Sequence, residues 1–422
     1  MAVAFDDQRA VAAAGLLLPA TLAGRLGIER LVNETVDLGG RAGGALPGRK
    51  VLALVDGMLA DADSIDDMGV LRSGRTEVVL GHRVMAPSTL GTFLRAHTFG
   101  HVRQLDRVLG ECLTRAWRAG AGPGEGRLDV DVDSFVGEVH GYAKQGAAFG
   151  YTRRRGYHPL LATRADTGEV LHVRLRKGSA ASPRGVLRFT DELIARVARA
   201  GATGEKLLRA DSAFWNKQLM ARLERAGWQY SIGVRLQFWV TDAIAAIPEC
   251  DWQPLVDYPD DGEAQIAQTM VGPKRLVVRR TRLLGPQAEL WPDWRHFAFL
   301  TNRCEALEDV ESEHRRHAVV ELAIRDLKDQ ALGHFPSGRF SANSAWTVIA
   351  CLAHNVLRWT SVIGLAGQTV PTARTLRRRL LQIPGRLTRN ARRFTLHLPA
   401  RWPWQHDFIR ALARIRALPA AA

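Results

Sequence analysis

The chain has 422 residues, of which 46% are hydrophobic and 24% charged, an ordinary composition for a globular protein of two or three domains. Its 58 Lys and Arg residues outnumber 43 Asp and Glu residues, so the formal net charge is +15. Such an excess of positive charge favours a polyanionic partner, nucleic acid before an anionic membrane surface, and argues against an acidic or disordered chain.

The sequence also argues against a membrane or secreted protein. The longest apolar stretch, residues 10–23, is interrupted by Gly15 and Pro19 and is too short to span a bilayer. Asp6 and Asp7 precede it, where a secretory signal carries positive charge. The four cysteines are scattered without a C-x-x-C pair, so no structural disulfide is expected. We therefore expect a cytoplasmic protein with no membrane partner.

Residues 1–120 are predicted to form a helical domain. Apolar residues recur at helical spacing in three stretches, residues 21–38, 48–62 and 86–120. Ser88 and Thr89 are candidate N-caps for the third stretch. The sequence "AGAGPGEG", residues 119–126, then breaks the helical pattern and marks a domain boundary.

The period of the apolar pattern changes to two after this break. In "RLDVDVDSF", residues 127–135, apolar residues alternate with Asp129, Asp131 and Asp133. One face of the predicted strand is therefore apolar, and the other presents three carboxylates. Like charges on one strand face are unfavourable unless a cation lies beside them, which indicates a site.

The rest of residues 126–236 follows the order strand, strand, helix, strand, helix, strand. The turn "DTGE" joins the first two of these strands, and Asp211 lies at the end of the third. With the strand at 127–135, the first three strands should form an antiparallel meander, and the later strands should join it through helical crossovers. This order predicts an α/β fold with a ribonuclease-H-like domain, a mixed five-stranded sheet with helices on both sides.

The remaining residues divide into three segments. Residues 237–312 have the pattern of strands and loops and are predicted to be a β-rich insertion. Residues 313–365 are helical and should complete the α/β domain. Residues 366–422 form a basic C-terminal tail, in which the stretch 374–416 holds twelve arginines, no lysine and one acid. So one-sided a run favours contact with phosphate.

The helix that opens the segment 313–365 has two stripes. Its apolar stripe, which should face a core, consists of Val320, Ala323, Ile324, Leu327 and Ala331. Its second stripe consists of His314, His317, Glu321, Arg325 and Lys328. Pairing between Glu321 and Arg325, worth about 0.3–0.5 kcal/mol, would explain the single carboxylate without any site.

Three acids of the predicted domain offer a functional alternative. Asp133 on the first strand, Asp211 after the fourth strand and Glu321 on the late helix should meet at one edge of a ribonuclease-H-like sheet. Such carboxylates can hold two Mg²⁺ ions, with Mn²⁺ as a substitute, for in-line phosphoryl displacement. Asp131 points the same way as Asp133 and is the alternative first ligand.

Long stretches of the chain resemble the DDE transposases of bacterial insertion sequences, most closely the family numbered thirteen-eighty. They include "APSTLGTFLRAHTFGHVRQLD", "DVDSFVGEVHGYAKQGAAFGYT", "GYHPLLATRADTGEVLHVRLRKGSA", "LRADSAFW", "VVELAIRDLK" and "RNARRFTLHLPARWPW". Relatives carry the signature Y-x2-R-x3-E-x6-K. Here His314, His317, Glu321 and Lys328 keep this spacing, with His in place of both Tyr and Arg.

The resemblance implies residue roles. Asp133, Asp211 and Glu321 would be catalytic metal ligands. Asp133 is preferred as the first of them because the first metal-binding Asp of relatives is closely followed by Ser or Thr, as Ser134 follows here. Asp131 stays in reserve. The expected DNA contacts are Lys144, Arg153, Arg154, Arg155, His314, His317, Arg325 and Lys328. Trp291 and Trp294 lie in an insertion that holds a flipped base in related transposases, although a packed tryptophan pair is equally consistent with the sequence.

The resemblance further implies a transposase whose catalytic domain comprises residues 126–236 and 313–365. Its partner would be double-stranded DNA: the N-terminal helices would read the terminal inverted repeats, and the ends would be cleaved and joined to target DNA by a homodimer assembled on DNA. Two alternatives remain, a metal-dependent nuclease that cuts without joining and a DNA-binding protein with a decayed site. The two histidines that depart from the signature favour the second, whereas the presence of all three acids and Lys328 argues against it.

Overall fold

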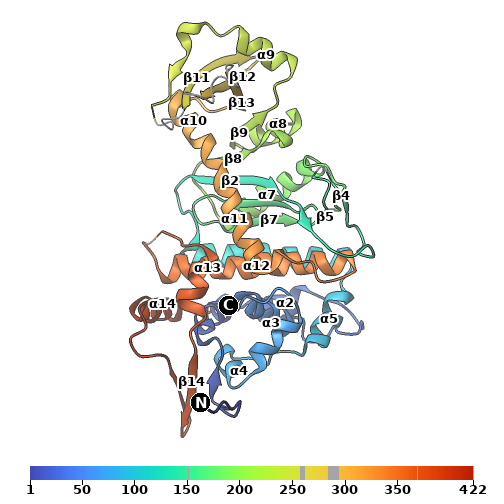
Figure 1. Cartoon of the computed structure of the whole chain (residues 1–422), viewed down its shortest axis with the longest axis vertical. Helices are drawn as coiled ribbons and strands as arrows, with labels where there is room; N and C mark the ends of the chain where they lie inside the picture. The colour runs from blue at the N-terminus through green and yellow to red at the C-terminus, as the bar shows by residue number, and fades with distance from the viewer. Residues whose placement is uncertain (151, 257–261, 284–293, 368, 422) are drawn as a thin grey trace.

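The computed structural model describes residues 1–150, 152–256, 262–283, 294–367 and 369–421. The molecule is elongated and built in layers along its long axis (Figure 1). A strand-rich end is followed by a mixed sheet with helices, by one long helix, α12, by the N-terminal helices, and finally by a small two-stranded ribbon near the N-terminus. This mixed α/β architecture confirms the predicted α/β class.

Helices dominate the first 121 residues, as predicted. They are α1 (Leu17–Arg25), α2 (Ile28–Thr35), α3 (Pro47–Leu59), α4 (Thr76–Leu80), α5 (Pro87–Ala96) and α6 (Phe99–Ala116). The prediction that Ser88 or Thr89 caps a helix is wrong. Helix α5 begins at Pro87, whose missing N–H costs nothing at the first helical position. The side-chain cap lies at Thr98, which forms a reciprocal capping box with His101 at the start of α6.

The central sheet has the predicted order of directions. It contains β2 (Leu128–Ser134), β6 (Leu160–Arg164), β7 (Val170–Arg174), β8 (Lys206–Ala210) and β9 (Gln229–Val234). Strand β6 lies antiparallel to both β2 and β7, and β8 lies parallel to both β2 and β9. The parallel connections run through α7 (Val186–Ala200) and α8 (Lys217–Arg225). The meander and both helical crossovers are therefore present.

The sheet is larger than the five strands predicted. Four more strands, β10 (Gln253–Pro254), β11 (Gly262–Val271), β12 (Lys274–Leu283) and β13 (Arg295–Thr301), extend it to nine within the described residues. Strand β13 pairs antiparallel with β9 and thereby satisfies backbone groups that an edge strand would leave unpaired. Helix α9 (Phe238–Ala245) precedes these strands where only strand and loop were expected, since so short an apolar run fits either structure.

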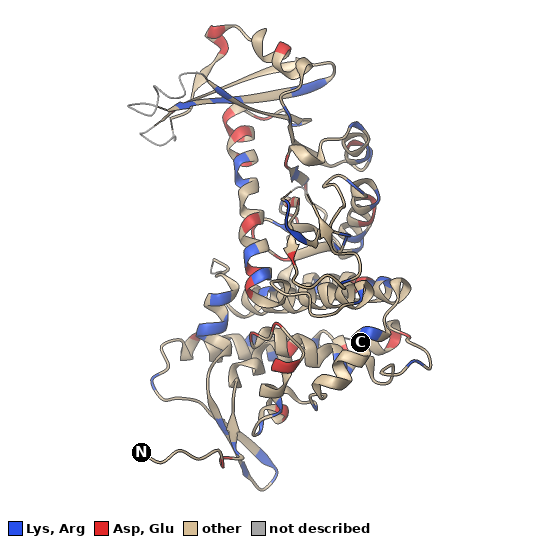
Figure 2. Cartoon of the chain, turned by 45° about the vertical axis from the view of Figure 1, so that its right-hand side comes forward, with Lys and Arg blue, Asp and Glu red and all other residues tan. Residues whose placement is uncertain are grey.

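The predicted helix around Glu321 is interrupted. Helix α10 (Leu307–Arg315) leads through a 3₁₀ turn (Arg316–Ala318) into α11 (Val319–Leu327), and a π turn (Lys328–Leu332) follows. Figure 2 shows both basic and acidic residues along this run. Its apolar stripe is buried as predicted, with Val320 2% and Leu327 0% exposed.

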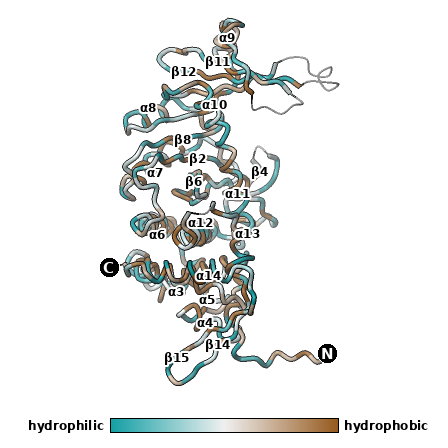
Figure 3. Tube along the Cα trace, turned by 90° about the vertical axis from the view of Figure 1, so that its left-hand side faces the viewer, coloured by the Kyte–Doolittle hydropathy of each residue, from teal (hydrophilic) through white to brown (hydrophobic). Residues whose placement is uncertain are grey.

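Helix α12 (Phe340–Gly364) links the layers and is almost entirely buried. It packs against β7 on one side and against the N-terminal helices α1, α3, α5 and α6 on the other. The side-chain amide of Asn355 donates to the carbonyl of Val170 at 2.8 Å and accepts from its N–H at 2.7 Å. Figure 3 shows the same order of layers from another side. Among the described helices, none combines the length and apolar character needed to cross a membrane.

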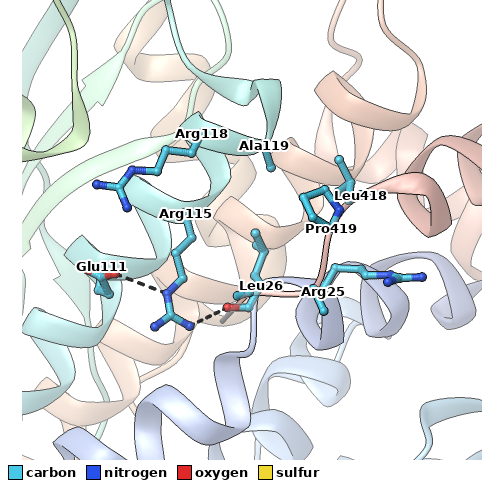
Figure 4. A pocket seen from close by; sticks show the side chains of 10 residues that line it. Arg25, Leu26, Glu111, Arg115, Arg118, Ala119, Leu418 and Pro419 are labelled. Carbon is cyan, nitrogen blue, oxygen red and sulfur yellow. Dashed lines mark hydrogen bonds and ion pairs between the residues drawn. The ribbon is translucent and has the colours of Figure 1, made fainter.

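The predicted basic tail is folded. Its described elements are α13 (Ala373–Leu376), β14 (Gly385–Asn390), β15 (Arg393–His397) and α14 (Gln405–Ala417). Strand β14 pairs with β1 (Ala10–Val11), and α14 packs on α1 and α12. Leu418 and Pro419 then lie beside α6 at a cavity of about 360 Å³, where Arg115 joins Glu111 to the carbonyl of Leu26 (Figure 4). The C-terminal end of the chain therefore belongs to the layer of N-terminal helices.

Candidate active site

The three aspartates of β2 line up towards the helical run α10–α11. The first, Asp129, is half-buried and forms a bidentate ion pair with Arg127, with oxygen to nitrogen distances of 2.7 and 3.0 Å. Arg127 also reaches the carboxylate of Glu313 on α10 at 2.6 Å. The charge of Asp129 is therefore balanced.

Asp131 is fully buried and is balanced more tightly. Arg209 on the neighbouring strand β8 donates to both of its oxygens, from Nε at 2.7 Å and from Nη2 at 2.9 Å. His317 Nδ1 lies 3.0 Å from Oδ1 of the same carboxylate. Both oxygens of Asp131 are thus occupied by protein groups.

Asp133 has no such cation. Its Oδ1 accepts a hydrogen bond from the backbone N–H of Ser134 at 2.6 Å. Burial, reinforced by the charges of Asp211 and Glu321, raises the pKa of Asp133 to about 6, against the opposing effects of the Ser134 N–H and of His317. The other two carboxylates predicted to meet here therefore lie close enough to Asp133 for their charges to act on it.

The other two members of this acidic cluster reach it from different elements. Asp211 follows β8 and is exposed, and its Oδ1 accepts from the N–H of Ala213, capping the 3₁₀ turn Ser212–Phe214. Glu321 is exposed on α11, and no residue in the described part of the chain forms an ion pair or hydrogen bond with its carboxylate. The expected pairing of Glu321 with Arg325 does not occur.

The donor set suits a hard divalent cation. Carboxylate oxygens are the ligands that Mg²⁺ prefers, and a cation would offset the burial and the neighbouring negative charges that raise the pKa of Asp133. In the described residues the three carboxylates do not bring one oxygen each within 4.8 Å of the others. One ion shared by all three therefore requires a side-chain rotation, and the exposed Glu321 has room to make it.

A tighter cluster lies elsewhere, between α6, β7 and α7. One ligand atom each of Asp106, His172 and Glu192 lie within 4.8 Å of one another. Three arginines already neutralise these acids, namely Arg103, Arg174 and Arg196. Against the effect of burial, the hydrogen bond with His172 and the charges of Arg174 and Arg103 hold the pKa of Glu192 down at about 2. This cluster is a buried ion-pair network that joins helix to sheet.

The two histidines of the signature lie in different surroundings, because the 3₁₀ turn changes the helical face between them. The ring of His314 stacks on Phe299 with centroids 4.0 Å apart, and Nδ1 lies 2.8 Å from the hydroxyl of Ser231. Burial lowers the pKa of His314 to about 3, so the ring is neutral at physiological pH. His317, in contrast, lies beside Asp131 and Asp133.

The basic residues predicted on this helix lie after Glu321. Arg325 and Lys328 are both exposed. The Lys328 ammonium lies 4.8 Å from the ring centroid of Phe135, two residues beyond Asp133, and partial burial lowers its pKa. The fold therefore brings Lys328 close to the C-terminal end of β2, where Asp133 lies.

The remaining predicted DNA contacts surround a small second sheet, β3 (Gly137–Glu138), β4 (Ala148–Phe149) and β5 (Arg155–Tyr157). Arg153 is exposed with a left-handed φ of 56°, and Arg154 pairs with Glu138 at 3.0 Å. Arg155 donates to the carbonyls of Gly141 and Tyr142, and Lys144 donates to the carbonyl of Phe335. Two arginines are thus exposed at this sheet, whereas Arg155 and Lys144 brace its loops.

Of the two predicted tryptophans, only Trp294 lies in the described structure, and Trp291 falls outside the described residues. The guanidinium groups of Arg280 and Arg282 lie 4.5 and 4.6 Å from the ring centroid of Trp294. A cationic stack therefore surrounds this tryptophan.

The arginines that neutralise Asp129 and Asp131 were not predicted from the sequence. Arg127 and Arg209 were assigned no role. A signal was present for Arg209, because an arginine inside the apolar strand "EKLLRADSAFW" needs a buried acid as partner. In the parallel register of β2 and β8, that partner is Asp131.

Comparison with known proteins identifies one family. A family model described as "Transposase DDE domain group 1" matches residues 1–420. A search of curated proteins finds no match. Seven chains of solved structures match. One comes from the cryo-EM structure of the piggyBac transposase synaptic complex with hairpin DNA, with 13% identity, coverage of 88% of this chain and 80% of that chain, and a TM-score of 0.47. The family match spans nearly the whole chain, and the structural likeness is distant.

Proposed function

Since the chain belongs to the family of transposases with a group 1 DDE domain, we propose that it binds the terminal inverted repeats of a bacterial insertion sequence, cleaves the ends and joins them to target DNA. The reaction is metal-dependent phosphoryl transfer at Asp133, Asp211 and Glu321. These residues belong to a ribonuclease-H-like catalytic domain made of residues 126–236 and 313–365, with residues 237–312 as an insertion.

The observation that carries this proposal is the unequal balance of charge along β2. Arg127 and Arg209 neutralise the first two aspartates, whereas in the described structure the third pairs with no arginine or lysine and feels the charges of two further carboxylates. An uncompensated acidic cluster is costly unless it has a positively charged ligand. We therefore assign the first metal ligand to Asp133 and give Asp131 a structural role.

Asp133, Asp211 and Glu321 would hold two Mg²⁺ ions, or Mn²⁺ in their place. When bound there, such ions activate the attacking oxygen and stabilise the leaving oxygen of an in-line displacement. His317 and Arg209 position the acids, since both contact Asp131 and Arg209 also donates to the carbonyl of Glu313 at 2.8 Å. Through these contacts they hold the start of α11 against β2.

The positive residues around the acidic cluster orient the DNA. Arg325 and Lys328, one and two turns after Glu321, are placed to contact phosphate, and the exposed Arg153 and Arg154 extend this surface from the small sheet. His314, as a neutral ring packed on Phe299, supports the helix instead of contributing charge. The net charge of +15 favours double-stranded DNA as the partner.

The N-terminal helices of residues 1–120 are proposed to bind the terminal repeats, and two copies of the chain assemble on the paired ends. A reaction that joins two DNA ends to one target needs two such sites. Basic residues of the C-terminal tail that precede α14 add phosphate contacts next to these helices.

The test is cleavage and joining of a labelled duplex bearing the ends of the element that encodes the chain, in Mg²⁺ or Mn²⁺. Wild type should form joined product, and Glu321→Gln should lower its rate by at least about 100-fold, as expected for loss of a metal ligand. The matched control is Glu308→Gln, an exposed acid in the first turn of α10, which should react like wild type.

Each other outcome points to a different protein. Cleavage without joined product would make the chain a nuclease. Specific binding of the ends by wild type with neither cleavage nor joining would make it a DNA-binding protein with a decayed site.

A further inference from the structure

The ribbon formed by β14 and β15 projects from the end of the molecule at which the N-terminus lies (Figures 1 and 3). Its strands are joined by a two-residue turn, since Asn390 pairs directly with Arg393. Cross-strand partners share a face, and faces alternate along each strand. One face therefore carries only polar side chains, namely Arg386, Thr388, Asn390, Arg393, Thr395 and His397.

The opposite face anchors the ribbon. Leu387 lies opposite Leu396 and is buried in a cluster with Val11, Ala14 and Val79. Strand β1 covers one edge of β14. The polar face is consequently left outside: five of its six residues are exposed, and Thr388 is half-buried.

The ribbon is strongly basic. Residues 385–398 contain four arginines and no acid. In the described structure a single carboxylate pairs with the polar face, that of Asp7 at 3.4 Å from Arg386, and both side chains are about half exposed. Exposed pairs of this kind contribute little and are readily exchanged for another anion.

We propose that the polar face of the ribbon lies in the major groove of duplex DNA and reads base edges there, an inference that rests on the proposed function of the chain as a DNA transposase. The major groove is about 12 Å wide and admits a two-stranded ribbon. Arginine suits guanine, asparagine suits adenine, and threonine hydrogen-bonds to several bases. The ribbon thus adds a DNA-reading element to the N-terminal helices against which it packs.

Two double variants that remove the same charge test the proposal. Arg386→Ala with Arg393→Ala alters the polar face, and Arg410→Ala with Arg416→Ala removes two exposed arginines of α14. The probes are a labelled duplex carrying the element's own end and a scrambled duplex of equal length and composition. Binding of each by the full chain is measured between 50 and 300 mM salt, with thermal unfolding as a check on folding.

The ribbon variant should bind the element's end at least about tenfold more weakly than the α14 variant, with a salt dependence reduced by about two ions. A separate variant, Asn390→Ala, should lose at least about fivefold of the preference for the end over the scrambled duplex. The charge-preserving Arg393→Lys should keep general affinity and lose part of that preference.

Equal losses in the two double variants, or wild-type binding by the ribbon variant, would overturn the proposal. So would a change in oligomeric mass with unchanged DNA binding, which would make the open edge of β15 a contact between copies of the chain. These readouts do not depend on catalysis. If wild type binds its ends specifically but never cuts them, the proposed function fails and the ribbon proposal stands.

Discussion

Adjacent carboxylates of β2 differ in electrostatic role although they share a strand face. Asp131 is 0% exposed and faces the buried guanidinium of Arg209. We expect Asp131→Asn to lower the free energy of unfolding by about 3–5 kcal/mol, because it leaves a buried arginine without its counter-charge. Chemical denaturation measures this loss. A stability equal to that of wild type would show that Arg209 finds another anion or water.

Replacement of Asp133 should change the free energy of unfolding in the opposite direction. Burial and its acidic neighbours raise its pKa to about 6, so the folded chain binds this proton more tightly than the unfolded chain, where an Asp titrates near pH 4. Stability from the protonated group is present below about pH 4 and is lost as pH rises through 6. Asp133→Asn should therefore raise the unfolding free energy at pH 8, by up to about 3 kcal/mol, and leave it unchanged at pH 4.

The response to Mg²⁺ distinguishes a metal-binding role of Asp133 from the effect of its burial alone. At pH 8, Mg²⁺ should raise the thermal midpoint of wild type, and chelation should reverse the rise, whereas Asp133→Asn should respond less. A variant that is no more stable than wild type at pH 8 would show that the acidic cluster is not under repulsion.

At the scale of elements, the starts of α5 and α6 differ in whether a side chain caps the helix. Thr98 and His101 satisfy backbone donors at the start of an 18-residue helix, whereas Ser88 follows Pro87 inside the first turn of α5. Thr98→Ala should cost about 1 kcal/mol, and Ser88→Ala should cost a few tenths at most. Thermal and denaturant unfolding of the two variants give the comparison. Equal costs would show that the reciprocal bonds at Thr98 add nothing.

The sheet was predictable because its strands carry strong local signals. Period-two alternation identified β2, and the turn "DTGE" identified the hairpin of β6 and β7. Strand and helix order also predicted that Asp211 and Glu321 lie near Asp133, as their electrostatic effect on it indicates, whereas their role as metal ligands stays a prediction.

Features that depend on distant contacts were not predictable. The 3₁₀ turn at residues 316–318 separates His314 from His317 although both fit one helical stripe. The tail was predicted from its arginines alone, but β14 exists because β1 and a cluster containing Leu387 are there to receive it. Pairing of β13 with β9 likewise joins residues more than sixty positions apart.

At the scale of the molecule, α12 ties the N-terminal helices to the sheet. Its two sides pack on α1, α3, α5 and α6 and on β7, so neither layer is covered without it. We expect a fragment of residues 1–124 to lack a cooperative thermal transition, whereas the full chain should unfold these two layers together. Calorimetry of both proteins, with hydrogen exchange of the full chain, measures this. A fragment that folds alone would show that the helical layer has an independent core.

The pairing of Asp131 with Arg209 has a consequence for how β2 finds its place. The repeat of Asp129, Asp131 and Asp133 makes the strand degenerate, because sliding it by two residues keeps every apolar side chain on the same face. Hydrophobic alternation alone cannot distinguish these alignments. Arg209 stands directly opposite Asp131 in the parallel register, and its surroundings are buried. The slide is opposed because Asp129 or Asp133 would then have to occupy the buried place beside Arg209, and neither could keep the partners it has now. A buried side chain thus selects which of three equivalent carboxylates reaches the acidic cluster.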